Sequence, residues 1–232
     1  VGMDYSKATD GNQAVDGKVT GINTVGGLYG YKSTTGSGST NQRDWLVSNV
    51  EVTATSGRAG GAIGYSFHAS SQNAKILNCT IKGTTFVGGY EGGDGGTGTR
   101  YTYNLQVVGC TIENTLEDAG DSDFKKIGVG GVYGNQSSEQ NVRMWGITVR
   151  DCEIIGPKYV GGIIGAAAFT QDRFFFDRIY VAEDVTVTAR QSMAGGFVGY
   201  AERITITDSA CGATVTAGSS EAGGIIGHVE PQ

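Results

Sequence analysis

The chain has 232 residues, with 40 glycines, only 2 prolines, 17% charged residues and a formal net charge of −6. This composition excludes a collagen-like helix, which needs a glycine at every third position and abundant proline. The acidic balance argues against a nucleic-acid partner, because phosphate binding requires clustered lysine and arginine. No apolar run approaches the roughly 18 residues of a membrane-spanning helix, so we expect a chain that does not span a membrane.

One six-residue element occurs seven times along the chain, each time as an apolar residue, two glycines, two further residues and a third glycine. The copies lie at residues 25–30, 59–64, 87–92, 129–134, 160–165, 194–199 and 222–227. Their first glycines are 34, 28, 42, 31, 34 and 28 residues apart. A spacing near 30 with local variation is typical of stacked coils that carry loop insertions.

Two further apolar stretches precede each glycine element. In the third repeat they are the short stretch Lys75-Ile76-Leu77 and the alternating stretch Asn78–Gly83. Alternation with β-branched residues is typical of strands with one buried face. The sequence therefore predicts an all-β fold, a single right-handed parallel β-helix over residues 1–232 with about seven coils of roughly 28–42 residues and three short strands per coil.

The glycines themselves are expected at the corners of the coils. A corner needs either a positive φ or a backbone packed tightly against the next coil, and glycine satisfies both. The sequence enters the first coil part-way, and it stops five residues after Gly227 with no capping helix. We therefore expect a segment of a larger protein, or a unit that stacks end to end through uncapped coils.

At these glycine elements the sequence resembles the GLUG-motif family, named for a short Gly-Gly-Leu/Val-x-Gly repeat. The segments 25–31 and 194–200 match best, because both end in Gly-Tyr, whereas the third copy departs with Glu91 and Gly93. The family occurs in large bacterial surface and secreted proteins, among them some immunoglobulin A peptidases and adhesin-like chains. The resemblance implies a secreted or cell-surface location and a stalk or adhesive role, with any peptidase in another domain.

Three of the four cysteines occupy one inward strand position. Cys79, Cys110 and Cys152 stand where other coils have Val50 and Val185, so we expect free, buried thiols that behave as small apolar side chains. Disulfides remain the alternative in an oxidising compartment, and Cys79 with Cys110 is the only pair that we expect to be placed to bridge neighbouring coils. No Cys/His cluster predicts zinc.

Acidic residues concentrate in the longest repeat. One stretch covers residues 91–96, and a second places Glu117, Asp118, Asp121 and Asp123 within seven residues. The second stretch is a weak calcium candidate, with a plain solvated acidic loop as the alternative. The two histidines, His68 and His228, lie four coils apart in the expected register, so no Ser-His-Asp site is expected. No cofactor other than this calcium is predicted.

A basic residue begins the middle strand region of the coils, and in the longer coils aromatic residues follow it. If these positions align, they form an outer stripe of flat rings beside guanidinium groups, suited to sugar rings or to a protein partner. The alternative is that the rings pack over the solenoid with arginine stacked on them. The candidate ligand-binding residues are Arg43, Trp45, Arg100, Tyr101, Tyr103, Arg143, Trp145, Arg173 and Phe175.

These patterns favour a binding or display module over an enzyme. The expected partner is a host or environmental glycan or a protein, bound by a secreted or cell-surface scaffold. One alternative is a carbohydrate-active β-helix enzyme, a polysaccharide lyase or hydrolase that uses the acidic coil. The other is a self-assembling filament protein that joins through the uncapped ends.

Overall fold

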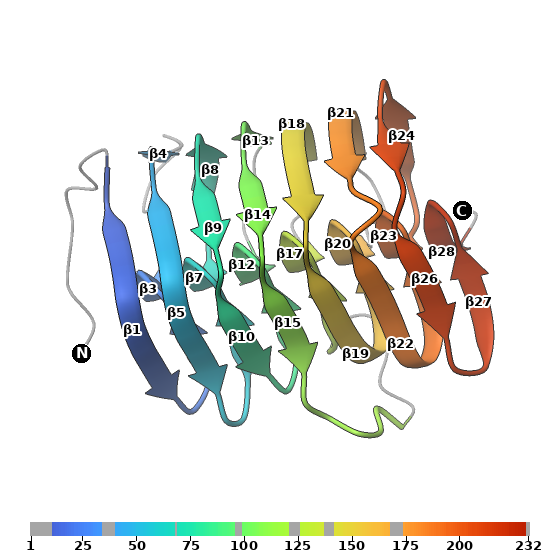
Figure 1. Cartoon of the computed structure of the whole chain (residues 1–232), viewed down its shortest axis with the longest axis horizontal. Helices are drawn as coiled ribbons and strands as arrows, with labels where there is room; N and C mark the ends of the chain where they lie inside the picture. Colours follow the sequence, from blue (N-terminus) through green and yellow to red (C-terminus); the bar gives the residue numbers. More distant parts are fainter. Residues whose placement is uncertain are drawn as a thin grey trace.

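The computed structural model confirms an all-β fold, a parallel β-solenoid (Figure 1). It describes residues 11–33, 40–67, 69–95, 99–120, 126–136, 142–167 and 174–230. These residues form 28 strands and no helix, and hence no helix long and apolar enough to cross a membrane. Strands pair only with equivalent strands of the coil before and after, as in the pairing of Ile81 with Val52 and with Ile112.

The strands stack in columns, and their bounds follow column by column. The long face holds β1 (Gln13–Gly21), β5 (Leu46–Ala54), β10 (Thr80–Gly83), β15 (Thr111–Asn114), β19 (Glu153–Gly161), β22 (Thr186–Gly195) and β26 (Thr214–Ala217). The column before the double glycine holds β2 (Thr24–Gly26), β6 (Arg58–Gly60), β11 (Phe86–Gly88), β16 (Gly128–Gly130) and β27 (Ser220–Gly223).

A separate seven-stranded sheet follows the double glycine, with β3 (Tyr29–Lys32), β7 (Ile63–Ser66), β12 (Glu91–Asp94), β17 (Tyr133–Gln136), β20 (Ile164–Ala167), β23 (Val198–Ala201) and β28 (Ile226–Val229). The next column holds β4 (Thr40–Arg43), β8 (Ala69–Gln72), β13 (Arg100–Tyr103), β18 (Val142–Arg150), β21 (Phe174–Val181) and β24 (Ile204–Thr207). The shortest strands are β9 (Lys75–Leu77), β14 (Gln106–Val108) and β25 (Ala210–Cys211).

The solenoid has slightly fewer coils than predicted, and the coil of the third repeat has more strands than the three predicted. Seven stacked strands in the separate sheet give six steps along the axis, so the solenoid has about six turns where seven coils were predicted. The three predicted stretches of the third repeat are all extended, as β9, β10 and the pair β11 and β12 around the double glycine. The additional strand β8 makes five short strands in that coil.

The second glycine of each element is fixed by close packing between coils and not by a positive φ. A Cβ on Gly131 would lie 2.1 Å from the carbonyl oxygen of Gly162, and one on Gly162 would lie 2.1 Å from that of Gly196. The same contact recurs up the stack, so a column of second glycines lets the coils approach. The left-handed corners instead use side chains that tolerate this region, such as Asn73 and Asn104.

The interior is filled by ladders of apolar side chains. Val52, Ile81, Ile112, Ile154 and Val187 are fully buried on successive coils. Burying apolar surface contributes about 25 cal/mol per Å², so the repeated inward column supplies much of the stability.

The cysteine ladder (Cys79, Cys110 and Cys152) is buried, and its thiols are free, as predicted. The Cys79 N–H lies 3.4 Å from Cys110 Sγ, and the Cys110 N–H lies 3.4 Å from Cys152 Sγ. The two neighbouring pairs are therefore equivalent. The expectation that Cys79 and Cys110 are the only pair placed to bridge coils is wrong.

Candidate functional site

Four neighbouring strands, β13, β18, β21 and β24, carry two outward rows of side chains. Successive residues of a strand point to opposite faces, so the inward residues Thr102, Met144 and Phe176 are buried and their neighbours face out. The parallel register aligns these neighbours across the coils. The first row is Tyr101, Arg143, Phe175 and Thr205, and the second row is Tyr103, Trp145, Asp177 and Thr207.

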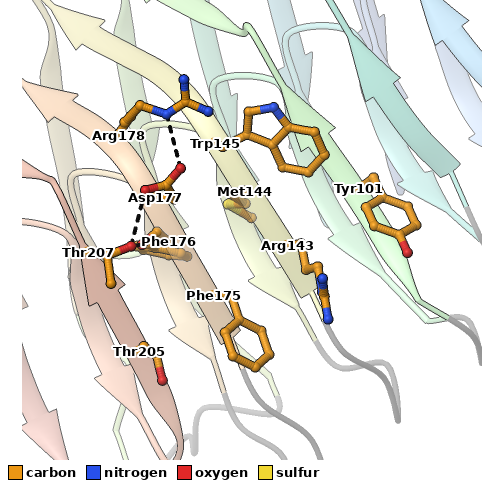
Figure 2. Close-up of a pocket in the computed structure, with 10 residues that line it drawn as sticks. All are labelled: Tyr101, Arg143, Met144, Trp145, Phe175, Phe176, Asp177, Arg178, Thr205 and Thr207. Carbon is orange, nitrogen blue, oxygen red and sulfur yellow. Dashed lines mark hydrogen bonds and ion pairs between the residues drawn. The ribbon is translucent and has the colours of Figure 1, made fainter.

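Between these rows lies a groove of about 420 Å³, shown in Figure 2. Trp145 stacks on Tyr103 with ring centroids 4.4 Å apart and planes 11° apart. Tyr101 meets the same indole edge-on, at 6.2 Å and 79°. The three rings form an aromatic platform, and Tyr101 remains 37% exposed.

Charged and hydroxyl groups occupy the other part of the groove. The Arg143 guanidinium lies over the Phe175 ring, 5.3 Å from its centroid, and the side chain is exposed. Asp177 Oδ2 pairs with Arg178 Nε at 3.0 Å, and Asp177 Oδ1 accepts a hydrogen bond from Thr207 Oγ1 at 3.1 Å. The groove can therefore offer a ligand flat apolar faces, hydrogen-bond donors and one stacked cation.

The structure brings together four of the predicted ligand-binding residues, Tyr101, Arg143, Trp145 and Phe175, as lining of one groove. Tyr103 supports this lining by stacking on Trp145. Arg43 is exposed in the second row, but two coils before Tyr103. Arg173 lies outside the described residues.

Two predicted ligand-binding residues lie in the interior, which corrects the expectation of an outer stripe that includes them. Trp45 is 1% exposed and packs between the rings of Tyr29 and Tyr90, at 5.3 and 6.4 Å. Arg100 is 3% exposed. Neither side chain can contact a ligand on the surface.

The basic residues do not align from coil to coil, so the condition for one continuous stripe is not met. Arg43 pairs with Gln72 of the next coil, Arg100 with Val142, and Arg143 with Phe175. The basic residues therefore occupy different rows.

A left-handed corner separates the inward tryptophan from the outward one. Asp44, Asn73, Asn104 and Gly146 all have a positive φ at equivalent positions of successive coils. Trp45 follows its corner residue and points inward, whereas Trp145 precedes its corner residue and points outward. The position of Asn, Asp or Gly beside each tryptophan was the sequence feature that could have distinguished the two.

A buried ionic cluster surrounds Arg100. Arg100 pairs with Glu91 and, through Nη1, with Asp94 at 2.8 Å, while Ser66 Oγ donates to Glu91 Oε1 at 2.6 Å. Burial raises the pKa of Glu91 to about 7, although Arg100 favours its charged form. These acids belong to the first acidic stretch of the longest repeat, and strand β12 holds them inside the solenoid.

The calcium candidate is only partly within the described residues. Asp121 and Asp123 lie outside them, while Glu117 and Asp118 are exposed. Asp118 Oδ1 accepts the Gly120 N–H at 2.7 Å, and this bond lowers the pKa of Asp118. Within the described ranges no three acidic, cysteine or histidine side chains form a metal-holding group. His68 is not among the described residues, and His228 Nδ1 lies 3.2 Å from Glu221.

The fold and the groove define a β-solenoid repeat protein with an aromatic platform on one column of strands. Comparisons with protein-family models, with curated proteins and with solved structures return no match for this chain. The GLUG resemblance therefore stays a prediction.

Proposed function

We propose that this chain is a binding module of a secreted or cell-surface protein, and that its groove takes a carbohydrate. The observation that carries the proposal is the partly exposed indole of Trp145, held by Tyr103 and Tyr101 beside Arg143. The GLUG resemblance and the weakly charged composition support the surface location.

A carbohydrate suits the groove because a sugar ring has one apolar face and a rim of hydroxyl groups. Aromatic rings contact the apolar face, while a few placed polar groups fix the orientation of the ligand. Here Trp145 supplies the ring, and Arg143 with Thr205 supplies hydrogen-bonding groups in the same groove. Parallel strands hold these side chains at fixed separations, so little conformational entropy is lost on binding.

Binding is favoured over hydrolysis by the arrangement of carboxylates. Glycoside hydrolysis generally uses two carboxyl groups on either side of the scissile bond. In the described lining of the groove, Asp177 is the one carboxylate, and it is engaged by Arg178 and Thr207. The acid pair Glu91 and Asp94 lies in the interior.

A glycan array tests the proposal with the purified chain and two matched variants. Trp145→Ala removes the centre of the platform, and Tyr180→Ala removes a ring that is 48% exposed but lies outside the groove. We expect saturable binding to one class of glycan. Trp145→Ala should lose this binding and Tyr180→Ala should retain it. The bound oligosaccharide should keep its length, because the chain does not cleave it. Binding that survives Trp145→Ala contradicts the proposed site, and cleavage of the bound glycan favours the enzyme.

A further inference from the structure

We infer that the ligand of this groove is an acidic oligosaccharide, one that carries a carboxylate or sulfate, and that Arg143 binds the anionic group. The inference rests on the proposed function and specifies its ligand class. The observation behind it is an imbalance of charge within the groove.

The groove has a surplus cation although the chain as a whole is acidic. Its charged lining groups are Arg143, Asp177 and Arg178. Asp177 and Arg178 pair with each other at 3.0 Å, whereas Arg143 forms no ion pair with any residue that the structure describes. Among the described lining residues one positive charge therefore remains uncompensated, on a protein with a formal net charge of −6. An anionic ligand complements this local charge.

The placement of Arg143 suits it to an oxyanion. Its guanidinium lies over Phe175, 5.3 Å from the ring centroid, and stacking of this kind leaves the N–H edge of the fork free. That edge matches the paired oxygens of a carboxylate, or two oxygens of a sulfate, in a bidentate contact. Because Phe175 already restrains the side chain, less freedom is lost when the contact forms.

The same strand places the cation and the platform at a useful separation. Arg143 and Trp145 lie on one face of β18, two residues apart, which corresponds to about 6.6 Å along a strand. A sugar ring on the indole of Trp145 therefore brings its own acidic substituent, or that of the next sugar, to Arg143.

The direction of the groove indicates how an extended ligand lies. The lining residues come from four successive coils, β13, β18, β21 and β24. Neighbouring strands are about 4.8 Å apart, so three steps cover roughly 14 Å. This length suits a short oligosaccharide that runs along the solenoid axis and crosses the strands, with rings at the Tyr101 end and hydroxyls at the Thr205 end (Figure 2).

The test measures binding of acidic oligosaccharides, each beside a neutral form of the same sugar. Galacturonate, glucuronate and mannuronate oligomers are compared with their methyl esters, and sulfated oligosaccharides with their desulfated forms, by isothermal titration calorimetry. We expect the chain to bind at least one acidic form about ten- to a hundredfold more tightly than its neutral form, the range of a charge-assisted hydrogen bond. This preference should shrink as salt rises.

Three variants separate the inference from the proposed function. Arg143→Gln should lose the preference for the acidic form while still binding the neutral form, and Trp145→Ala should lose both. Arg150→Gln, at an exposed arginine on the same strand but outside the groove lining, should bind like the unchanged chain.

Equal binding of acidic and neutral forms overturns the inference and leaves the proposed function standing. An unchanged acidic preference in Arg143→Gln also overturns the inference. Failure of the folded chain to bind any member of the panel, acidic or neutral, overturns the inference together with the carbohydrate function.

Discussion

Replacing a second glycine by alanine in a central coil should separate the coils, whereas the same change in the last coil should not. In Gly131→Ala the new Cβ lies 2.1 Å from the carbonyl oxygen of Gly162 and 3.1 Å from Ile154 Cδ1. The first neighbour is backbone of the next coil, so it cannot rotate away. At the equivalent Gly224 a Cβ meets nothing within 4 Å, which makes Gly224→Ala a control at the same motif position.

The size of the effect follows from the bonds beside the contact. Relieving the overlap requires the coils to move apart by more than 1 Å, which lengthens three backbone hydrogen bonds: Gly131 N–H to Gly161 O at 3.1 Å, Val132 N–H to Ile163 O at 2.9 Å, and Tyr133 N–H to Ile163 O at 3.0 Å. Each of these hydrogen bonds contributes about 1 kcal/mol to stability. If the coils instead stay in place and keep the bonds, the added methyl group causes overpacking strain of about 1–3 kcal/mol. We expect Gly131→Ala to lower the free energy of unfolding by about 3 kcal/mol.

Urea unfolding followed by circular dichroism measures both variants. With an m-value of about 2–3 kcal/mol per molar, 3 kcal/mol moves the midpoint down by about 1–1.5 M. Gly224→Ala should change the midpoint little or raise it slightly. Alanine lowers the conformational entropy of the unfolded chain, which stabilises the folded state by about 0.4–1 kcal/mol. Equal midpoints for the two variants, or greater damage from Gly224→Ala, would show that coil-to-coil contact is not what requires glycine.

Three further outcomes follow from the interior. Trp45→Ala should lower the free energy of unfolding by about 3–5 kcal/mol, because the ring is 1% exposed; a loss below about 1 kcal/mol in urea unfolding would place the ring outside the core. Burial raises the pKa of Glu91 from 4.5 to about 7, so its contribution to stability is complete below about pH 4.5 and is lost as the pH rises through about 7. Urea midpoints against pH should show this decline, and Glu91→Gln should flatten it; an identical slope in the variant refutes the assignment. The cysteine ladder is 2–3% exposed whereas Cys211 is partly exposed, so a thiol reagent should label Cys211 well before the ladder in the native chain, and equal rates would mean that the ladder opens.

The fold was predictable because the solenoid repeats its constraints in every coil. The double glycine marks the tight approach of one coil to the next, and alternation in stretches such as 78–83 marks the inward ladder. The glycine spacing alone could not predict which residues occupy the left-handed corners. Asn73 Nδ2 donates to Asp44 Oδ1 at 3.0 Å, and Asn104 Nδ2 donates to Asn73 Oδ1 at 3.2 Å, so polar side chains stacked on the outside mark corners that had been assigned to glycine.

Only part of the site could be predicted from the sequence. A shift of one position in the strand register decides whether a side chain points into the core or out to the surface. The pattern of a basic residue followed by an aromatic one is shared by Arg43 with Trp45 and by Arg143 with Trp145. The corner residue Asp44 precedes Trp45, whose ring points inward, whereas the corner residue Gly146 follows Trp145, whose ring points outward. Because the loops differ in length from coil to coil, the sequence spacing between the repeats does not show on which side of the corner each tryptophan lies.

Alternation along a strand separates stability from binding in this protein. On β18 the side chains of Arg143 and Trp145 face the groove, while Met144 between them is 1% exposed in the core. Met144 and Phe176 belong to the core and also line the groove, whereas the two outward rows do not join the core ladders and can vary in sequence at little cost to the fold. A loss of ligand binding in Arg143→Gln or Trp145→Ala therefore reports on the groove, whereas the same loss in a variant of Met144 would combine an effect on the core with one on the groove lining.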